Sequence, residues 1–207
     1  MKKLVLGLSA AVLLGAGIAR AEVMAQDIPP DFIAQFAPLA VPLIEKQFPN
    51  PPVKVTADSS KISGWHVMEK MGFVVMPDKG LTTKAVEEAS DKETPVAMFA
   101  TLSLAVQKGE AALPASDQAI AEVQGTFKIP VYFVSVKKKG DDRELEIYSK
   151  PEKAVLSVPL KKATAPAGDT AIVAKASNID LEKKKMDVTV NVGGYEGTFK
   201  LAVTDPS

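Results

Sequence analysis

The C-terminal third of the chain alternates apolar and polar residues so regularly that it restricts the fold more than any other feature. Within residues 185–203, "KMDVTVNVGGYEGTFKLAV", the alternating apolar positions are Val188, Val190 and Val192, then Phe199, Leu201 and Val203. Alternation with a period of two places one face of a strand in a core. Gly193 and Gly194, between the two arms, supply the positive backbone angles that a tight turn needs. The pattern therefore predicts an antiparallel hairpin.

Shorter segments of the same kind precede this hairpin. Strands are expected at residues 53–57, 72–80, 95–109, 128–136, 143–149, 154–160 and 170–176. In residues 95–109 six apolar residues recur at period two, although the alanine content leaves a helix as the alternative. Strands at this spacing predict a β-rich α+β fold. In it, an antiparallel sheet is bent into a sandwich or partial barrel, and short N-terminal and middle helices pack on it.

Three segments show helical signals instead. Residues 28–48 place Phe32, Phe36, Leu39, Leu43 and Phe48 near helical spacing. Two prolines within this segment each remove a backbone donor, so either one short helix or two broken pieces are expected. Residues 83–90 follow a capping threonine, Thr82, and residues 115–125 begin with Ser116-Asp117 and end in a glycine.

The first residues have the order of a secretory signal peptide. Lys2 and Lys3 are followed by an uncharged apolar run, residues 4–18, and by Ala19-Arg20-Ala21. A run of this length is short for a membrane span, so cleavage after Ala21 is expected, with an uncleaved anchor as the alternative. The expected organisation is a signal peptide over 1–21 and one mature domain over 22–207, comprising a helical segment (22–50), a mixed α/β part (51–127) and an antiparallel β part (128–207). The mature protein would be periplasmic or secreted, with no membrane span.

Charge and cysteine content narrow the partners. Removal of Lys2, Lys3 and Arg20 takes the basic residues from 25 to 22, against 25 acidic ones. A mildly acidic chain has no electrostatic reason to bind nucleic acid. Arg143 is then the only arginine, which disfavours a phosphate-rich ligand. The chain has no cysteine, so it contains no disulfides and a packed core must stabilise the fold.

The same composition limits the chemistry. Zinc and copper sites depend on histidine and cysteine, and the chain has one histidine, His66, and no cysteine. A serine–histidine–aspartate triad would need His66, and no G-x-S-x-G sequence surrounds a serine. Neither a phosphate-binding loop nor a G-x-G-x-x-G turn is present. No catalytic, cofactor-binding or metal-ligating residue is assigned, and no cofactor is expected.

Trp65, the only tryptophan, is adjacent to His66 in "KISGWHVMEKMG", residues 61–72. As a strand, this segment would place Trp65 and Val67 on one face and His66 on the other. As a helix, Trp65 would join an apolar stripe with His66 beside it. In both cases Trp65 is interpreted as a core residue and His66 as a structural one. Only a cavity beside His66 would favour a site there.

Charged residues cluster at one predicted turn. The acids are Asp141, Asp142, Glu144 and Glu146, and they lack the spacing of a calcium loop. Because Glu144 and Glu146 alternate with apolar residues, they are interpreted as a solvated strand face. Three lysine runs, at 137–139, 161–162 and 183–185, fall at strand ends, where they would keep strand edges soluble.

These observations favour an exported, non-enzymatic protein that acts as a binding or interaction module. The partner would be an unknown protein or a small apolar ligand. One alternative is a carrier of a lipid-like ligand in the concave face of the sheet. Apolar residues that could supply such a cavity are Phe73, Met76, Met98, Phe99, Tyr132 and Phe133. A second alternative is a secreted hydrolase that uses His66 or a pair of carboxylates.

Overall fold

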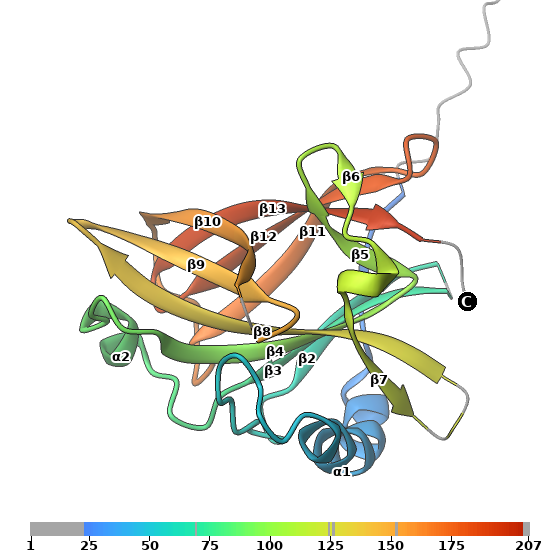
Figure 1. Cartoon of the computed structure of the whole chain (residues 1–207), viewed down its shortest axis with the longest axis horizontal. Helices are drawn as coiled ribbons and strands as arrows, with labels where there is room; N and C mark the ends of the chain where they lie inside the picture. The colour runs from blue at the N-terminus through green and yellow to red at the C-terminus, as the bar shows by residue number, and fades with distance from the viewer. Residues whose placement is uncertain (1–22, 69, 124, 126, 152, 205–207) are drawn as a thin grey trace, which may run out of the picture.

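The computed structural model describes residues 23–68, 70–123, 125, 127–151 and 153–204, which form a 13-stranded antiparallel sheet and two α-helices (Figure 1). The predicted signal peptide, residues 1–21, lies outside these residues. The helices are α1 (Pro30–Gln47) and α2 (Thr83–Glu87), with a short 3-10 turn, η1 (Ala115–Asp117). The strands are β1 (Gln26–Asp27), β2 (Ser63–Val67), β3 (Met71–Pro77), β4 (Thr94–Leu102), β5 (Leu104–Lys108), β6 (Ala111–Ala112), β7 (Ala119–Val123), β8 (Phe127–Lys139), β9 (Asp142–Tyr148), β10 (Ala154–Lys162), β11 (Ile172–Asp180), β12 (Lys185–Val192) and β13 (Tyr195–Val203).

The sheet curls into a half-barrel. Its order is β1-β2-β3-β4-β8-β9-β10-β13-β12-β11, with β5 paired to β13 and β7 paired to β8. β11 comes back against β2 and β3 without pairing to them. The expected β-rich α+β fold with a bent antiparallel sheet is therefore confirmed. Neither helix in the described part of the chain is long and apolar enough to cross a membrane.

An aromatic row fills the interior of the half-barrel. The Trp65 and Phe73 rings stack at 5.2 Å, Phe73 lies 5.0 Å from Phe99, and Phe99 lies 6.4 Å from Phe199. These four side chains come from β2, β3, β4 and β13, so the row joins the two sides of the curled sheet. Phe73 and Phe99 are fully buried. The interior of the sheet is therefore a packed core, held by ring contacts as well as by burial.

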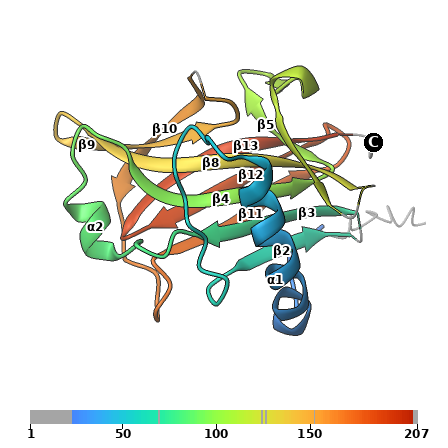
Figure 2. The same ribbon diagram turned by 60° about the horizontal axis from the view of Figure 1, so that its bottom comes forward.

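Helix α1 covers the outer face of the sheet. In Figure 1 it lies below β2 and β3, on the side away from β10, β12 and β13, and Figure 2 shows it crossing β4, β3 and β2. Its buried residues are Ala37, Ala40, Val41 and Ile44. They belong to a second core cluster that includes Met76, Met98, Val131 and Phe133. One sheet thus separates two apolar layers.

Helix α1 is continuous, so the alternative of two broken pieces is wrong. Pro38 and Pro42 lie inside it, four residues apart, and both are exposed. Four residues are close to one turn, so the two prolines share one solvent-facing side of the helix. The backbone carbonyls that lose a partner there can be hydrated by water.

Several other expectations about elements are confirmed. The hairpin of β12 and β13 turns at Gly193 and Gly194, whose φ angles are 56° and 84°. The hydroxyl of Thr82 accepts a hydrogen bond from the backbone of Ala85, as expected of a helix cap. Residues 61–72 contain a strand, β2, that ends at Val67 and is followed by a turn before β3. Trp65 faces the interior and His66 lies on the outer face.

Three expectations are wrong in part. Residues 115–125 form η1 and β7 rather than a helix, because Ala119, Ala121 and Val123 pair along β8. Residues 95–109 are strand but break at Ser103, whose φ is 53°, and the chain passes from β4 to β5. Residues 53–57 alternate in burial without joining a ladder, apart from one bridge from Ala57 to Asp78.

Arg143 supports the fold rather than a ligand. Its guanidinium donates hydrogen bonds to the backbone carbonyls of Val86 and Glu87, at the end of α2. It also lies 4.4 Å from the centre of the Tyr195 ring. The planar, multi-donor guanidinium suits this combination of carbonyl bonding and ring stacking. The only arginine in the described residues is therefore used to hold α2 against the sheet.

Candidate functional site

An apolar groove lies between α1 and the outer face of the sheet, with a volume of about 740 Å³. On the helix side it is lined by Phe32, Phe36, Leu39 and Leu43. Their spacing of four, three and four residues makes one stripe along the helix. This stripe lies beside the buried one that packs α1 on the sheet. The apolar surface of α1 is therefore wider than its buried stripe, and the groove lies along the part that the sheet does not cover.

The sheet forms the floor of the groove, and two of its residues there, Gly72 and Ala100, are small. The floor residues are Gly72 and Val74 of β3 and Ala100 and Leu102 of β4. Gly72 pairs with Leu102 and Val74 pairs with Ala100 across the two strands. An added Cβ atom at Gly72 would lie 3.8 Å from the nearest side-chain atom, which is ordinary contact. The backbone therefore does not require glycine at this position, and its missing side chain leaves open space.

Large apolar side chains at the groove are unusually exposed. The exposed fractions are 58% for Phe32, 69% for Leu39 and 42% for Leu102. Single exposed apolar residues are common on protein surfaces, but a contiguous set marks a binding site more often. The three side chains border one hollow from two different elements, α1 and β4.

Two residues of the groove lining, Thr101 and His66, have polar side chains. The hydroxyl of Thr101 donates to the backbone carbonyl of Leu104 at 2.6 Å, so its proton is already used. His66 is half-buried, and its Nδ1 atom lies 2.7 Å from the backbone carbonyl of Met68. A carbonyl only accepts, so Nδ1 carries the proton in this contact. The sequence favoured a site at His66 only if a cavity lay beside it, and the structure places the groove there.

The residues expected to line a ligand cavity lie elsewhere. Phe73, Phe99 and Tyr132 are in the interior core, and Met76, Met98 and Phe133 are beneath α1. All six are buried, and none lines the groove. Sequence reasoning therefore missed the groove residues. The available signal was the width of the apolar surface on α1, which exceeds what one packing contact needs.

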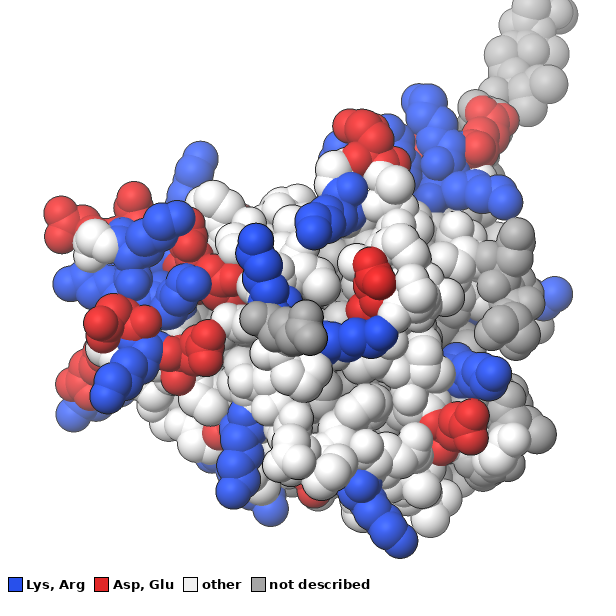
Figure 3. All heavy atoms as spheres, viewed as in Figure 1, with Lys and Arg blue, Asp and Glu red and all other residues white. Residues whose placement is uncertain are grey.

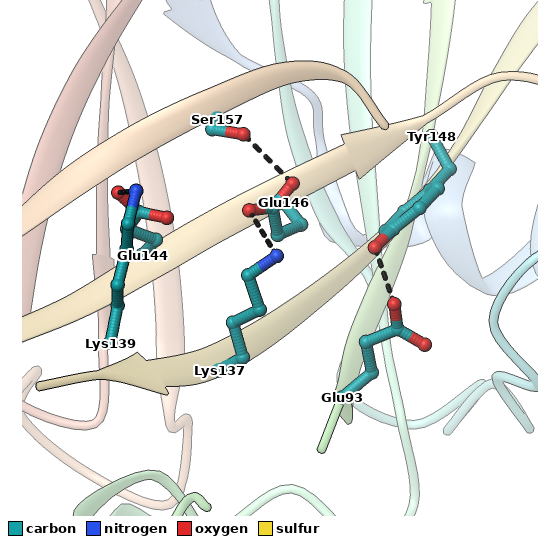
Figure 4. Close-up of polar contacts among 7 residues, drawn as sticks. All are labelled: Glu93, Lys137, Lys139, Glu144, Glu146, Tyr148 and Ser157. Carbon is teal, nitrogen blue, oxygen red and sulfur yellow. Dashed lines mark hydrogen bonds and ion pairs between the residues drawn. The ribbon is translucent and has the colours of Figure 1, made fainter. Parts of the chain in front are cut away.

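The sequence predicts that Glu144 and Glu146 lie on a solvated strand face, and in the structure they form a paired network on β8, β9 and β10 (Figure 4). Glu146 is only 2% exposed, so that prediction is wrong for it. Its carboxylate pairs with Lys137 at 2.8 Å and accepts a hydrogen bond from Ser157 at 2.8 Å. Glu144 pairs with Lys139 at 2.9 Å. Burial of these carboxylates is tolerated because each one meets a lysine.

A second hollow, about 660 Å³ in volume, lies over this network. Its charged lining consists of Asp91, Glu93, Glu144, Glu146, Lys137, Lys138, Lys139 and Lys153. Figure 3 shows acidic and basic side chains mixed at the end of the molecule with the β8–β9 turn, while much of the middle of this face carries none. The lining has equal numbers of positive and negative side chains, so it carries no net charge to attract a ligand of one sign. The network therefore explains the packing of the strands better than it explains binding.

The same region offers no nucleophile arrangement in the described residues. Ser135 and Lys138 have the S-x-x-K spacing, but residues three apart on a strand face opposite sides. The Ser135 hydroxyl is buried and has no hydrogen-bond partner among the described residues. Within the same described ranges, no group of three acidic or histidine side chains is arranged to hold a metal ion.

Comparison with protein-family models, with curated proteins and with solved structures finds no match for the chain.

The charged network predicts a loss of stability in alkali. The hydrogen bond to Glu146 raises the pKa of Lys137. Burial raises the pKa of Tyr148, and the hydrogen bond to Glu93 raises it further. Burial also raises the pKa of Tyr132, to about 12. The unfolded chain loses these protons near pH 10 to 10.4, before the folded protein does. The stabilisation is therefore complete below about pH 10 and is lost as pH rises further.

Urea unfolding at pH 8, 10, 11 and 12 would measure this loss, and Tyr148→Phe should make the dependence on pH shallower. Phenol absorbance near 295 nm gives a second readout, because at least two of the three tyrosines should ionise late in the folded protein. Ionisation of all three together near pH 10, without unfolding, would contradict the assignment.

Proposed function

We propose that this protein is an exported, non-enzymatic binding protein that holds a small apolar ligand in the groove beside α1. The single observation that carries this proposal is the groove itself, in which exposed apolar side chains of α1 lie beside an apolar floor that includes Gly72 and Ala100. Small-molecule sites are typically concave, mostly apolar and about 300–1,000 Å³ in volume. The groove has these three properties. Export follows from the predicted leader and places the binding step outside the cytoplasm.

The proposal favours a small ligand over a protein partner for a geometric reason. Docking of a protein segment would be expected to need a broad apolar face with a polar rim. Here the exposed apolar residues border a hollow whose lining includes the small residues Gly72 and Ala100. A slender ligand reaches such a hollow more easily than a folded partner does. A protein partner is the alternative to this small ligand.

A neutral fluorescent probe tests the proposal. N-phenyl-1-naphthylamine should bind the purified protein saturably, at one site. Leu39→Glu should weaken that binding about tenfold, because an ionised carboxylate must stay hydrated beside an apolar ligand. Met24→Glu is the matched control. Met24 is also apolar and exposed, at 72%, but it does not line the groove.

Two results would overturn the proposal. One is a wild-type protein that binds no apolar probe. The other is an equal loss of probe binding in Leu39→Glu and Met24→Glu, which would place the probe on the surface in general. Native mass spectrometry of the protein purified under mild conditions adds an independent readout, with a retained apolar adduct as the expected result.

A further inference from the structure

We infer that the ligand of the groove is an elongated amphiphile whose polar end is a carboxylic acid held by His66. The inference rests on the proposed function and adds the chemical class and the orientation of the ligand. Its apolar body would lie along α1, and its acid group would lie at the end of the groove where α1 begins.

The length of the ligand follows from the helix. The groove-lining stripe runs from Phe32 to Leu43, which are 11 residues apart. At a rise of about 1.5 Å per residue this stripe is about 16 Å long. An extended hydrocarbon chain with C–C bonds of about 1.5 Å advances about 1.25 Å per bond, so the stripe matches about 12 to 14 carbons.

The position of His66 defines the polar end. His66 pairs with Gln26 of β1, and the chain passes from β1 directly into the start of α1. The backbone of Ile28, just before α1, donates to Gly64 on the same strand as His66. The other end of α1 lies at β7, where Gln47 exchanges two hydrogen bonds with the backbone of Glu122. His66 therefore lies at one end of the groove and not at its middle.

The chemistry of His66 selects an acid. Nδ1 donates to Met68, so the remaining ring nitrogen is Nε2, which has no hydrogen-bond partner among the described residues. In a neutral ring with Nδ1 protonated, Nε2 accepts a hydrogen bond, and in a charged ring it donates one. A carboxylic acid complements both states, because the acid and the ring share one proton. An ester lacks that proton and the corresponding negative charge.

Nearby charges are compatible with this pairing. Asp27 pairs with Trp65, next to His66, and Asp31 lies in the first turn of α1; both are exposed to water. A ligand that brings its own proton adds no net negative charge beside them when it pairs with a neutral ring. Thr101 pairs with Phe73, so its side chain lies on the interior face, where its hydroxyl donates to the carbonyl of Leu104. In the described structure, His66 is thus the groove residue with an unused polar atom.

A competition series tests the inference. Tetradecanoic acid, its methyl ester and tetradecan-1-ol would each displace N-phenyl-1-naphthylamine from the tag-free protein. The wild type should prefer the acid to the ester about tenfold, as expected for a charge-assisted hydrogen bond. His66→Phe keeps a ring and removes both nitrogens. It should bind acid and ester with equal affinity.

A spectroscopic readout separates binding from a structural effect of the variant. The chain has a single histidine, so its ring nitrogens give one unambiguous set of 15N signals. Acid should shift the Nε2 signal toward the protonated position, and ester should leave it unchanged. If acid and ester displace the probe equally from the wild type, the inference is wrong while the proposed function stands. If neither ligand nor probe binds, the proposed function itself fails.

Discussion

Gly72→Phe is expected to abolish ligand binding while leaving the protein folded. Gly72 lines the groove on the face opposite Phe73, so the new ring would project into the space that the ligand occupies. Exclusion of three or four methylene contacts at about 0.8 kcal/mol each corresponds to a loss of affinity of about 100-fold. The backbone accepts the side chain, because an added Cβ atom lies 3.8 Å from Leu102 and 3.9 Å from the carbonyl of Trp65.

Gly72→Ala is the matched control, since it adds one methyl group and should change affinity less than about threefold. Neither variant should lower the stability. An aromatic residue suits a strand better than glycine does, so Gly72→Phe should keep or raise the melting temperature. Probe titration and thermal unfolding together check both halves of the prediction. Undiminished binding by a stable Gly72→Phe protein would place the site outside the groove.

Phe73→Ala is expected to cost about 3–5 kcal/mol of unfolding free energy, the range for aromatic truncation in a packed core. Phe73 is fully buried and lies between the rings of Trp65 and Phe99. Its removal leaves a cavity in the middle of the row that joins both sides of the half-barrel. A loss of this size is a large share of the stability of an ordinary domain.

The control for this variant is Phe32→Ala, which truncates the same residue type at a site that is 58% exposed. It should cost less than about 1 kcal/mol of unfolding free energy, because more than half of the Phe32 side chain is already exposed to water in the folded protein. Urea unfolding of both variants gives the comparison. If the two variants lost similar amounts of stability, the interior row would not be the main source of the fold's stability.

Much of the sheet could be predicted from the sequence because its strands alternate. Val188, Val190 and Val192 are all fully buried, as their period implies. Residues 115–125 show where local signals failed. A capping pair and a terminal glycine indicated a helix, but Ala121 and its neighbours alternate as well, and pairing with β8 decided the outcome. Local propensity predicted the wrong element because it contains no information about pairing with β8.

The candidate site was harder to predict for a related reason. Leu39 and Ala40 are adjacent on α1, yet one is 69% exposed and the other is fully buried. Periodicity identifies an apolar stripe without showing which of two neighbouring stripes meets the sheet. The burial of Glu146 could not be predicted from its own strand either. Its neighbours Lys137 and Ser157 come from two other strands, so their approach depends on the register of the sheet.

The single tryptophan, Trp65, is an intrinsic fluorescence probe at one known position. Trp65 is 3% exposed, and its ring is stacked on Phe73. The next residue of β2, His66, has its side chain on the opposite face of the sheet, at the groove. Emission from this protein therefore reports on one pair of strands and not on an average over several sites. A shift of the emission to longer wavelength would mark the separation of β2 from β3. Titration of ligand against Trp65 fluorescence would measure, without any label, whether the sheet responds to an occupant on its far side.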